Sequence, residues 1–344
     1  PASATSQAAR APRARTMTST PEAEVAATAR PKRKGQPQRK IVRRTVDGVL
    51  LLDKPQGVSS NGALQTARRL LNAAKAGHTG TLDPMASGLL PLTFGEATKF
   101  SQMLLDADKV YEAVVQLGVE TDSGDADGAV TATRPVRVGQ RDLETVLERF
   151  RGEIEQVPPM YSALKRDGKA LYEYAREGIE LERAARRVTI HALELLDFDG
   201  ERFTFTIRVH CSKGTYIRSL AMDIGAALGC GAHLSALRRT AIGGFDLSSA
   251  VTLRELEAAG EGGRDALLAP VDTLVATFPA LTLDADAARA LLQGRVLDEP
   301  RGAPGVAVRV YGPTGFLGLG RWQDDGRLAP RRLISSAGPT KAIA

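Results

Sequence analysis

Residues Gly77 to Pro91 read Gly-His-Thr-Gly-Thr-Leu-Asp-Pro-Met-Ala-Ser-Gly-Leu-Leu-Pro and hold a single carboxylate, Asp83. Gly80 permits backbone conformations that other residues avoid, while Pro84 fixes its own φ and favours extended geometry at Asp83. The segment is therefore too interrupted to be a regular element, and its shape depends on its surroundings. Two compatible interpretations follow: Asp83 caps a helix that starts at Pro84, or its side chain is presented for function.

The chain is large enough for more than one domain, and its charge is unevenly placed. Its 344 residues are 43% hydrophobic, which is enough for a sizeable core. Residues 1–45 hold 11 Lys or Arg and 2 Asp or Glu, a local charge of +9, so the remainder carries −3 of the total +6. If the folded body binds nucleic acid, it must use a local basic face rather than a global field.

The sequence carries few signals of secretion or membrane insertion. Cys211 and Cys230 are its two cysteines, and no apolar run follows the early arginines, so a disulfide scaffold and a secretory signal are not expected. No stretch approaches the ~18 continuous apolar residues of a membrane span. We therefore expect a cytoplasmic protein with no membrane partner.

Residues 1–45 form a basic tail that we expect to be disordered, because they lack a periodic apolar pattern. The cluster Arg30–Lys34 and the basic residues that follow could lie along a phosphate backbone, or the whole tail could simply be solvated. Arg10, Arg13 and Arg15 resemble part of an organelle transit peptide, but translation could equally begin at Met17.

From Val46 onward the periodicities predict strands and helices in mixed order. Lys109–Leu117 alternates apolar residues on one face, and Asp199-Gly200 is a hairpin signal. A helix capped by Ser59 or Ser60 is expected to end near Gly77. The other expected elements are strands at 49–52, 188–198 and 202–211 and helices at 142–151, 170–177 and 216–228, the last capped by Thr215. This irregular order predicts an α+β fold with a mixed, largely antiparallel sheet and helices on its face.

A composition change near Gly260–Gly263, followed by the passage 272–279, divides the chain. Beyond it we expect a helix at 285–292 and strands at 306–311, 316–322 and 328–333, which would form a small β-barrel-like module. The predicted organisation is a tail at 1–45, a main domain at 46–273 and a C-terminal domain at 274–344.

Two sets of residues could supply metal ligands. Asp122, Asp125 and Asp127 lie in a Gly-rich segment, but the spacing and the closing Glu of a calcium loop are missing, so a solvated loop is expected. Cys211, Cys230 and His233 offer three ligands without a CxxC pair, whereas structural zinc needs four. We expect buried thiols and no metal.

Several catalytic motifs are missing from the sequence. It has no Gly-x-Ser-x-Gly elbow, no GxxxxGK[ST] phosphate loop and no GxGxxG. Any catalysis is therefore left to a carboxylate. Arg218 is expected in the first turn of a helix, where the macrodipole disfavours a cation. It is either a surface arginine at a cost of ~0.3–1 kcal/mol, or it pairs with an anion such as a phosphate or Asp83. Taken singly, His78, Tyr111 and Tyr216 favour packing over function, and Leu237 alone would be a core residue.

Taken together, these residues fall within recognisable motifs. The motifs are Leu52-Asp-Lys-Pro-Gln-Gly-Val-Ser-Ser60, the Gly77–Pro91 stretch, Lys109-Val-Tyr111, Cys211-Ser-Lys-Gly-Thr-Tyr-Ile-Arg218 and Leu237-Arg-Arg239. From about Val46 to Leu333 the chain resembles the TruB family of tRNA pseudouridine synthases. The C-terminal module is similar to that family's small RNA-binding domain related to PUA.

The resemblance implies a role for each matching residue. Asp83 would be the nucleophilic aspartate and Arg218 the arginine that pairs with it. Tyr111 would stack on the target base, and His78 would fill the space that the base leaves. Tyr216 would be the second tyrosine and Leu237 the leucine wall of the pocket, as these positions match the family's motifs.

The implied reaction isomerises the T-loop uridine of tRNA, the family's uridine-55, and conserves atoms, so no cofactor is expected. An aspartate with an ordinary pKa near ~3.9 is already ionised at neutral pH and needs no activating base. Attack on the ring, attack on the sugar, and assisted elimination to a glycal all remain open. In the last route, Tyr111 could be the general base.

The expected partner is the T arm of tRNA, and we expect a monomer without an obligatory protein partner. Basic side chains would contact the RNA backbone, although several could be ordinary surface charges; they are Lys165, Arg186, Arg187, Arg238 and Arg239. A second hypothesis is a tRNA-binding folding factor with secondary isomerase activity. A relative that depends on a guide RNA is a further alternative.

Overall fold

The computed structural model describes residues 42–298 and 302–335, and the predicted tail lies outside them up to residue 41. Arg43 onward forms one compact unit. Arg44, assigned to the tail, belongs to the fold instead: its guanidinium donates to the carbonyl of Leu71 at 2.9 Å and pairs with Asp265. Among the described residues, no helix is long and apolar enough to cross a membrane.

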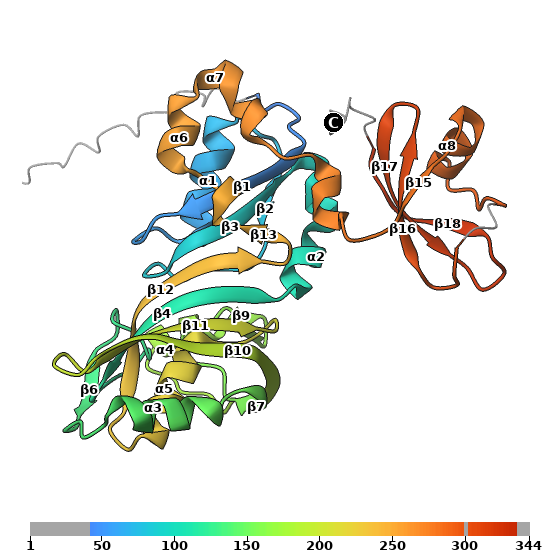
Figure 1. The fold of residues 1–344 in the computed structure, drawn as a ribbon. Helices are drawn as coiled ribbons and strands as arrows, with labels where there is room; N and C mark the ends of the chain where they lie inside the picture. Colours follow the sequence, from blue (N-terminus) through green and yellow to red (C-terminus); the bar gives the residue numbers. More distant parts are fainter. Residues whose placement is uncertain (1–41, 299–301, 336–344) are drawn as a thin grey trace, which may run out of the picture. The chain divides into compact units, whose positions relative to one another are not determined.

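A ten-stranded mixed sheet forms the centre of the fold (Figure 1). In sheet order, its main path consists of β14 (Val251–Thr252), β1 (Gly48–Lys54), β3 (Ser87–Phe94), β12 (Ala232–Ile242), β4 (Lys109–Leu117), β11 (Thr204–Cys211), β10 (Arg186–Asp199) and β7 (Gly152–Gln156). Two short strands complete it: β2 (Ala76–His78) pairs with β3, and β13 (Phe245–Asp246) pairs with β12. The β1–β14 and β3–β12 pairs are parallel and the others antiparallel, so the predicted α+β fold is confirmed.

Helices cover the sheet and bury its apolar positions. α5 (Ile217–Ala227) packs on β12, α3 (Gln140–Glu148) on β10, and α1 (Ser60–Leu70) against α6 (Leu253–Ala258), as Figure 1 shows. The shorter elements are α2 (Ser101–Asp106), α4 (Leu171–Arg176), α7 (Gly260–Gly263), the 3-10 turns η1 (Gly95–Phe100), η2 (Leu247–Ser249), η3 (Arg264–Leu267) and η4 (Val271–Val275), and the ribbons β5 (Val119–Thr121) with β6 (Val130–Thr133) and β8 (Lys165–Arg166) with β9 (Lys169–Ala170).

The strand predicted at Lys109–Leu117 is β4, and its alternation decides what the sheet buries. Tyr111, Ala113, Val115 and Leu117 are all buried in the main core, which also contains Leu220 of α5. Side chains at odd positions of β4 therefore face α5, and the even positions face the opposite side. Tyr111 is thus carried by a central strand of the sheet rather than by a loop.

Helix boundaries near the Gly77–Pro91 stretch differ from the prediction. Ser59 caps α1 as expected, accepting from the Gly62 N–H at 3.0 Å, but the helix ends at Leu70. Gly77 lies in β2 instead of at the helix end. No helix begins at Pro84: the carbonyl of Asp83 accepts the Ala86 N–H in a single turn. The capping interpretation of Asp83 is therefore wrong.

Two further local predictions need correction. The composition change at Gly260–Gly263 is not a break in the structure: these residues form the short helix α7, which continues from α6 through Ala259. Tyr216, not Thr215, is the N-cap of α5, and it makes no side-chain capping bond. The Thr215 hydroxyl donates instead to the carbonyl of Ser212 at 2.9 Å, which closes the turn before the helix.

The C-terminal segment contains a separate four-stranded sheet. β15 (Ala280–Thr282) pairs in parallel with β16 (Ala307–Gly312), and β17 (Gly315–Trp322) and β18 (Leu328–Leu333) follow as an antiparallel meander. The predicted helix at 285–292 is α8 (Ala285–Leu292), capped by the Asp284 carboxylate. The helix and three predicted strands of this small module are confirmed, and β15 is an addition.

Candidate active site

The predicted pocket residues come together from distant parts of the chain. A cavity of about 330 Å³, the smaller pocket, is lined by Asp83, Tyr111, Tyr216, Arg218 and Leu237 among others. These side chains come from the loop before β3, from β4, from the start of α5 and from β12. Its volume suits a small ring-sized ligand. The sequence predicted these five residues as one site, and the fold places them around one cavity.

Asp83 is held by backbone contacts on both sides of it. The Ser60 hydroxyl lies 2.8 Å from both the N–H and the carbonyl of Leu82, so it ties the loop to α1. The Gly57 N–H donates to the carbonyl of Pro84 at 2.7 Å, which anchors the other side. The loop is therefore fixed within the fold and presents the Asp83 side chain, which is 36% exposed, to the cavity.

Arg218 is buried and faces two carboxylates. One Nη atom lies 3.0 Å from the Asp83 carboxylate, and Nε lies 3.5 Å from that of Asp125. Its guanidinium also donates to the carbonyls of Ser123, at 3.1 Å, and Tyr161, at 2.6 Å. The side chain is only 5% exposed, so these partners fix its orientation. The anion expected beside Arg218 is therefore Asp83, joined by a second one.

Asp125 is the residue that the sequence interpretation missed. It was placed in a solvated loop, yet its side chain is 6% exposed. The Ser123 hydroxyl and the Asp127 N–H both donate to its carboxylate, and the Ala126 N–H donates to the carbonyl of Leu234 on β12. This pairing with a central strand turns the loop inward. The alternating acids of the segment were the available signal, but a solvated loop has the same composition.

The ionisation of Asp83 differs from the ordinary aspartate assumed from the sequence. Burial raises the pKa of Asp83, the Arg218 charge lowers it, and the nearby Asp125 raises it again, with a net increase over the usual 3.8. The negative charges of Asp83 and Asp125 thus repel each other, while both are attracted to the guanidinium of Arg218. Asp83 depends on Arg218 to remain charged inside the cavity.

Both tyrosines of the pocket are kept as neutral phenols. Burial is the main cause that raises the pKa of Tyr111 and of Tyr216 above the usual 10. Tyr216 is also positioned by a buried residue that the sequence did not single out. The side-chain amide of Gln156 accepts from the Tyr216 N–H at 3.1 Å and donates to its carbonyl at 3.3 Å. These contacts join β7 to the start of α5.

His78 lines a different cavity from the other predicted residues. A larger pocket of about 620 Å³ is bordered by His78, Asp83, Asp125, Tyr161 and Arg218 among others. Burial, with a smaller contribution from Arg239, lowers the pKa of His78 below 6.5, which favours neutral imidazole. Its buried Nδ1 has no hydrogen-bond partner among the described residues. Asp83 and Arg218 line both pockets, so the two pockets adjoin at this pair.

The basic side chains expected to contact RNA have different environments. Lys165, Arg186 and Arg187 are exposed, and Arg187 lies within 3.4 Å of Glu153. Arg238 is partly exposed and pairs with Asp53 at 2.7 Å. Arg239 is the exception, because it is 1% exposed.

The guanidinium of Arg239 donates to the carbonyls of Leu89, at 2.7 Å, and Gly80, at 3.2 Å. Both bonds lie inside the protein. The prediction that this side chain contacts an RNA backbone is therefore wrong. Arg239 instead ties β12 to the loop that carries Asp83. A double arginine in a strand gives no sign of which side chain points inward until the register is known.

Three family models match consecutive parts of the chain. Residues 68–217 match the family model described as TruB family pseudouridylate synthase (N terminal domain). Residues 218–276 match the tRNA pseudouridylate synthase B C-terminal domain, and residues 279–334 match Pseudouridine synthase II TruB, C-terminal.

Similar proteins cover most of the chain. A protein of Azoarcus sp. (strain BH72) named tRNA pseudouridine synthase B is 70% identical over 87% of this chain and 98% of its own length. One of the same name from Aromatoleum aromaticum is 66% identical over 86% and 94%. The solved structure of an H/ACA RNP bound to a substrate RNA containing 2′-deoxyuridine aligns over 84% of this chain and 86% of that chain, with 27% identity and a TM-score of 0.64. The chain belongs to the TruB family of pseudouridylate synthases.

Proposed function

We propose that this protein isomerises the T-loop uridine of tRNA, uridine-55, to pseudouridine, with Asp83 as the nucleophile. Close relatives carry the name tRNA pseudouridine synthase B, which supports an isomerase acting on tRNA. The observation that carries the assignment of the site is the Asp83–Arg218 pair at 3.0 Å, which opens on the smaller pocket. A charged carboxylate beside an apolar, ring-sized cavity is what attack on a flipped nucleoside requires.

Each pocket residue has a defined task in this reaction. Arg218 keeps Asp83 ionised and fixes the position of its carboxylate. Tyr111 offers an aromatic face to the flipped uracil, where stacking contributes ~1–3 kcal/mol per base. Leu237 closes the pocket with an apolar wall. Flipping costs a few kcal/mol, so stacking of this size offsets much of it.

The bond changes leave the composition of the nucleoside unchanged. The bond from the sugar carbon to N1 breaks, the uracil turns, and a bond from the same sugar carbon to C5 forms. The C5 proton leaves to solvent, and N1 takes up one proton in exchange. Burial raises the pKa of Tyr111, so its phenol is protonated in the resting pocket. In this proposal its ring stacks on the base.

RNA contacts complete the proposal. The T arm would lie along the exposed basic side chains of Lys165, Arg186 and Arg187, with Arg238 at its edge. His78 would fill the space that the base leaves. Residues 46–273 would act as the catalytic domain and 274–344 as an RNA-binding domain. The protein would work in the cytoplasm as a monomer without an obligatory protein partner.

Replacing Asp83 by Asn tests the nucleophile. Tritium release from C5-labelled tRNA should be abolished, while tRNA binding stays close to wild type because the amide keeps the shape of the carboxylate. Asp197→Asn, which changes an exposed aspartate on β10, should retain full activity. Turnover by Asp83→Asn at the wild-type rate would refute the assignment.

A tRNA-folding role is not favoured by the names of the relatives, each of which is a synthase. Comparing tRNA refolding by the wild type and by Asp83→Asn separates the two activities. Activity of the purified protein on a bare T-arm hairpin would exclude dependence on a guide RNA or a protein partner.

A further inference from the structure

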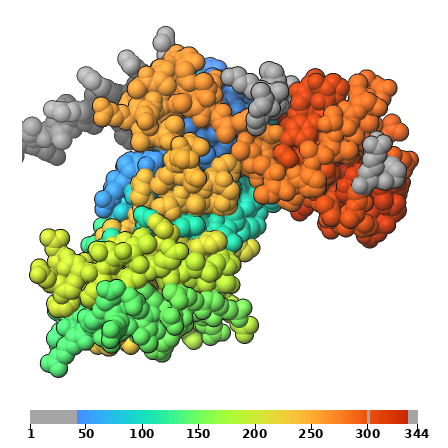
Figure 2. Space-filling view, viewed as in Figure 1, coloured from blue at the N-terminus to red at the C-terminus, as the bar shows by residue number. Residues whose placement is uncertain are grey.

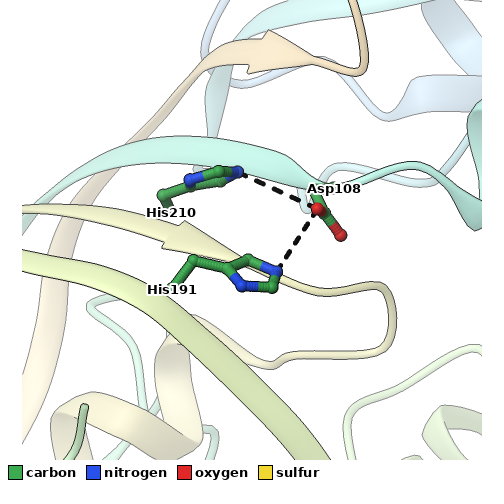
Figure 3. A group of neighbouring side chains, drawn as sticks. All are labelled: Asp108, His191 and His210. Atoms are coloured by element: carbon green, nitrogen blue, oxygen red, sulfur yellow. Dashed lines mark ion pairs between the residues drawn. The ribbon is translucent and has the colours of Figure 1, made fainter. Parts of the chain in front are cut away.

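Three side chains that the proposed reaction does not use converge on the outer face of the sheet. Figure 3 shows His191 and His210 directed at the carboxylate of Asp108. The Nε2 atoms of His191 and His210 lie 3.3 Å and 4.0 Å from the same oxygen, Oδ2 of Asp108. The candidate ligand atoms all lie within 4.8 Å of one another.

A β-bulge places the two histidines on one face. In β10, Ile190 pairs with Cys211 and Ala192 with His210, so His191 is the additional residue between them. Ile190 and Leu193 are both buried although three positions apart, which shows that the alternation shifts at the bulge. The side chain of His191 therefore lies beside His210, with ring centroids 4.8 Å apart.

The third group is fixed at the start of the neighbouring strand. Asp108 immediately precedes β4, and its carbonyl accepts the Gly243 N–H at 2.9 Å. Lys109 pairs with Cys211 in the β4–β11 ladder, so Asp108 lies next to the end of β11 that carries His210. Three adjacent strands thus supply one ligand each from a hydrogen-bonded framework.

We propose that Asp108, His191 and His210 bind a divalent late first-row transition metal ion, with Zn²⁺ as the expected occupant. Two imidazoles and one carboxylate form a donor set typical of zinc. A tetrahedral ion ~2.0–2.1 Å from its ligands separates them by about 3.3–3.4 Å, and the His191–Asp108 distance already has this value. The distance from His210 to Asp108, 4.0 Å, needs to shorten by less than 1 Å, and side-chain rotation would bring the three donors, which now lie within 4.8 Å of one another, around the ion.

The geometry suits one shared ion. A single oxygen of Asp108 faces the Nε2 atoms of both imidazoles, whose ring centroids lie 4.8 Å apart, so an ion between them can reach all three donors. The side chains of His191, His210 and Asp108 are 36%, 45% and 47% exposed, so an ion would keep an open position for water and exchange with solvent.

The proposed metal site is separate from the pocket that contains Asp83. Cys211 and Val209 are buried in the core, so His210, which lies between them on β11, points to the opposite face of the sheet. In Figure 2, yellow-green atoms of the segment around residues 190–210 lie at the surface of the molecule. The ion would therefore bind whether or not RNA occupies the pocket.

The test is metal binding by the full chain produced without an affinity tag and depleted of metal by a chelator. We expect one Zn²⁺ per chain in competition with a chromophoric chelator. His191→Ala and His210→Ala should each weaken binding by at least ~10-fold. Co²⁺ should give the absorption of an oxygen- and nitrogen-ligated ion, without the charge-transfer band of a thiolate.

The matched control is His233→Ala. His233 pairs with Gln116 at the far end of β4, and its ring contacts the carbonyl of Val119. This variant should bind Zn²⁺ like the wild type, and circular dichroism should show that all variants are folded. Unchanged Zn²⁺ affinity in either cluster variant, a thiolate band with Co²⁺, or less than one bound ion per chain would each overturn the proposal.

Discussion

The guanidinium of Arg218 interacts with two carboxylates at once. Asp83 is 36% exposed and lines both pockets, whereas Asp125 is 6% exposed and lines the larger one. We therefore propose that Asp125 is a positioning residue, which orients Arg218 and through it the carboxylate of Asp83. Its negative charge also raises the pKa of Asp83. Removing the charge of Asp125 has two opposite effects on the site. Arg218 becomes less well ordered, and Asp83 ionises more easily.

Asp125→Asn should lower the rate of the chemical step by ~10²-fold, because a small displacement of Arg218 misplaces Asp83. Affinity for tRNA should change little, since Asp125 does not lie on the exposed basic surface. Single-turnover tritium release and filter binding measure the two quantities. Asp127→Asn, an exposed carboxylate in the same loop, is the control, and equal rates for both variants would contradict the positioning role.

The raised pKa of Asp83 predicts the acid limb of the pH–rate profile. The single-turnover rate should be full at neutral pH and fall as the pH drops through a midpoint above 3.8, because protonated Asp83 cannot attack. The sign for stability is opposite. Since the folded pKa exceeds the unfolded value, protonation of Asp83 favours the native state. Melting curves over the same range control for unfolding, and a rate that stays constant to pH 3.8 would contradict this prediction.

At the residue scale, the position of Arg218 in the first turn of a helix gave only a weak signal, and the family motif supplied its pairing with Asp83. The structure places the two at 3.0 Å. Sequence reasoning failed for Asp125, whose loop bonds to β12, and for Arg239, which lies on β12 and bonds to Leu89 of β3. When a strand distant in sequence determines whether an aspartate or arginine is buried, no local sequence pattern reveals it.

The element that carries Asp83 is a loop with a close backbone contact beside it. Gly88 at the start of β3 has φ +101°, and a Cβ there would lie 2.2 Å from the carbonyl oxygen of Arg239. The parallel contact between β3 and β12 therefore requires glycine. Because Arg239 also binds the carbonyl of Gly80, a displacement at this contact would reach the loop.

Gly88→Ala should destabilise the protein by more than the ~1–3 kcal/mol of an unfavourable φ, since the backbone clash adds to the strain. Gly57→Ala is the matched control: its φ is +82°, but nothing lies within 4 Å of the added Cβ. Urea denaturation of both variants measures the difference. Equal midpoints would show that the close contact between β3 and β12 has no energetic weight.

Helices and strands with a clear hydrophobic periodicity were predictable from the sequence. The strands with which they pair were not. The strand at 109–117 and the hairpin at 199–200 follow from local alternation and turn chemistry. The order β3-β12-β4 joins segments more than 100 residues apart, so it depends on tertiary packing. The turn at Pro84 was mistaken for a helix start because an Asp-Pro pair is common in turns and at helix starts. The hydrogen bond from the Gly57 N–H to the carbonyl of Pro84 favours the turn.

At the scale of the whole molecule, charge is separated along the chain. Residues 1–41 hold 9 Lys or Arg and 2 Asp or Glu, so this segment carries +7 and the rest carries −1 of the total +6. A body close to neutral gains little from long-range attraction to RNA. Non-specific affinity should therefore depend on the tail, and specific recognition on the folded part.

A chain that begins at Val42 should bind tRNA less tightly at low salt and show a shallower dependence on salt, by about one phosphate contact or more. Its catalytic rate at saturating tRNA should equal that of the full chain, because the described site contains no residue before Ser59. Binding titrations at several salt concentrations provide the measurement. Identical slopes for the two chains would show that the tail does not contact RNA.

The fold class was predictable from the whole sequence because runs of strand and helix signals without βαβ alternation exclude a parallel α/β sheet. The C-terminal module was predictable for a similar reason, since its three strands are separated by Gly-rich turns. Sheet topology and the meeting of five segments at one pocket are global properties. Both properties depend on the pairing of all the strands and cannot be read from any one segment of the sequence.

The carboxylate of Asp83 borders two pockets. Asp83 and Arg218 border both the smaller pocket, beside Tyr111 and Leu237, and the larger pocket, beside His78 and Tyr161. A compound that fills the larger pocket would touch the pair without imitating a nucleobase. The larger pocket is therefore a second inhibitor-binding site on the enzyme, where an inhibitor need not resemble uridine to be selective.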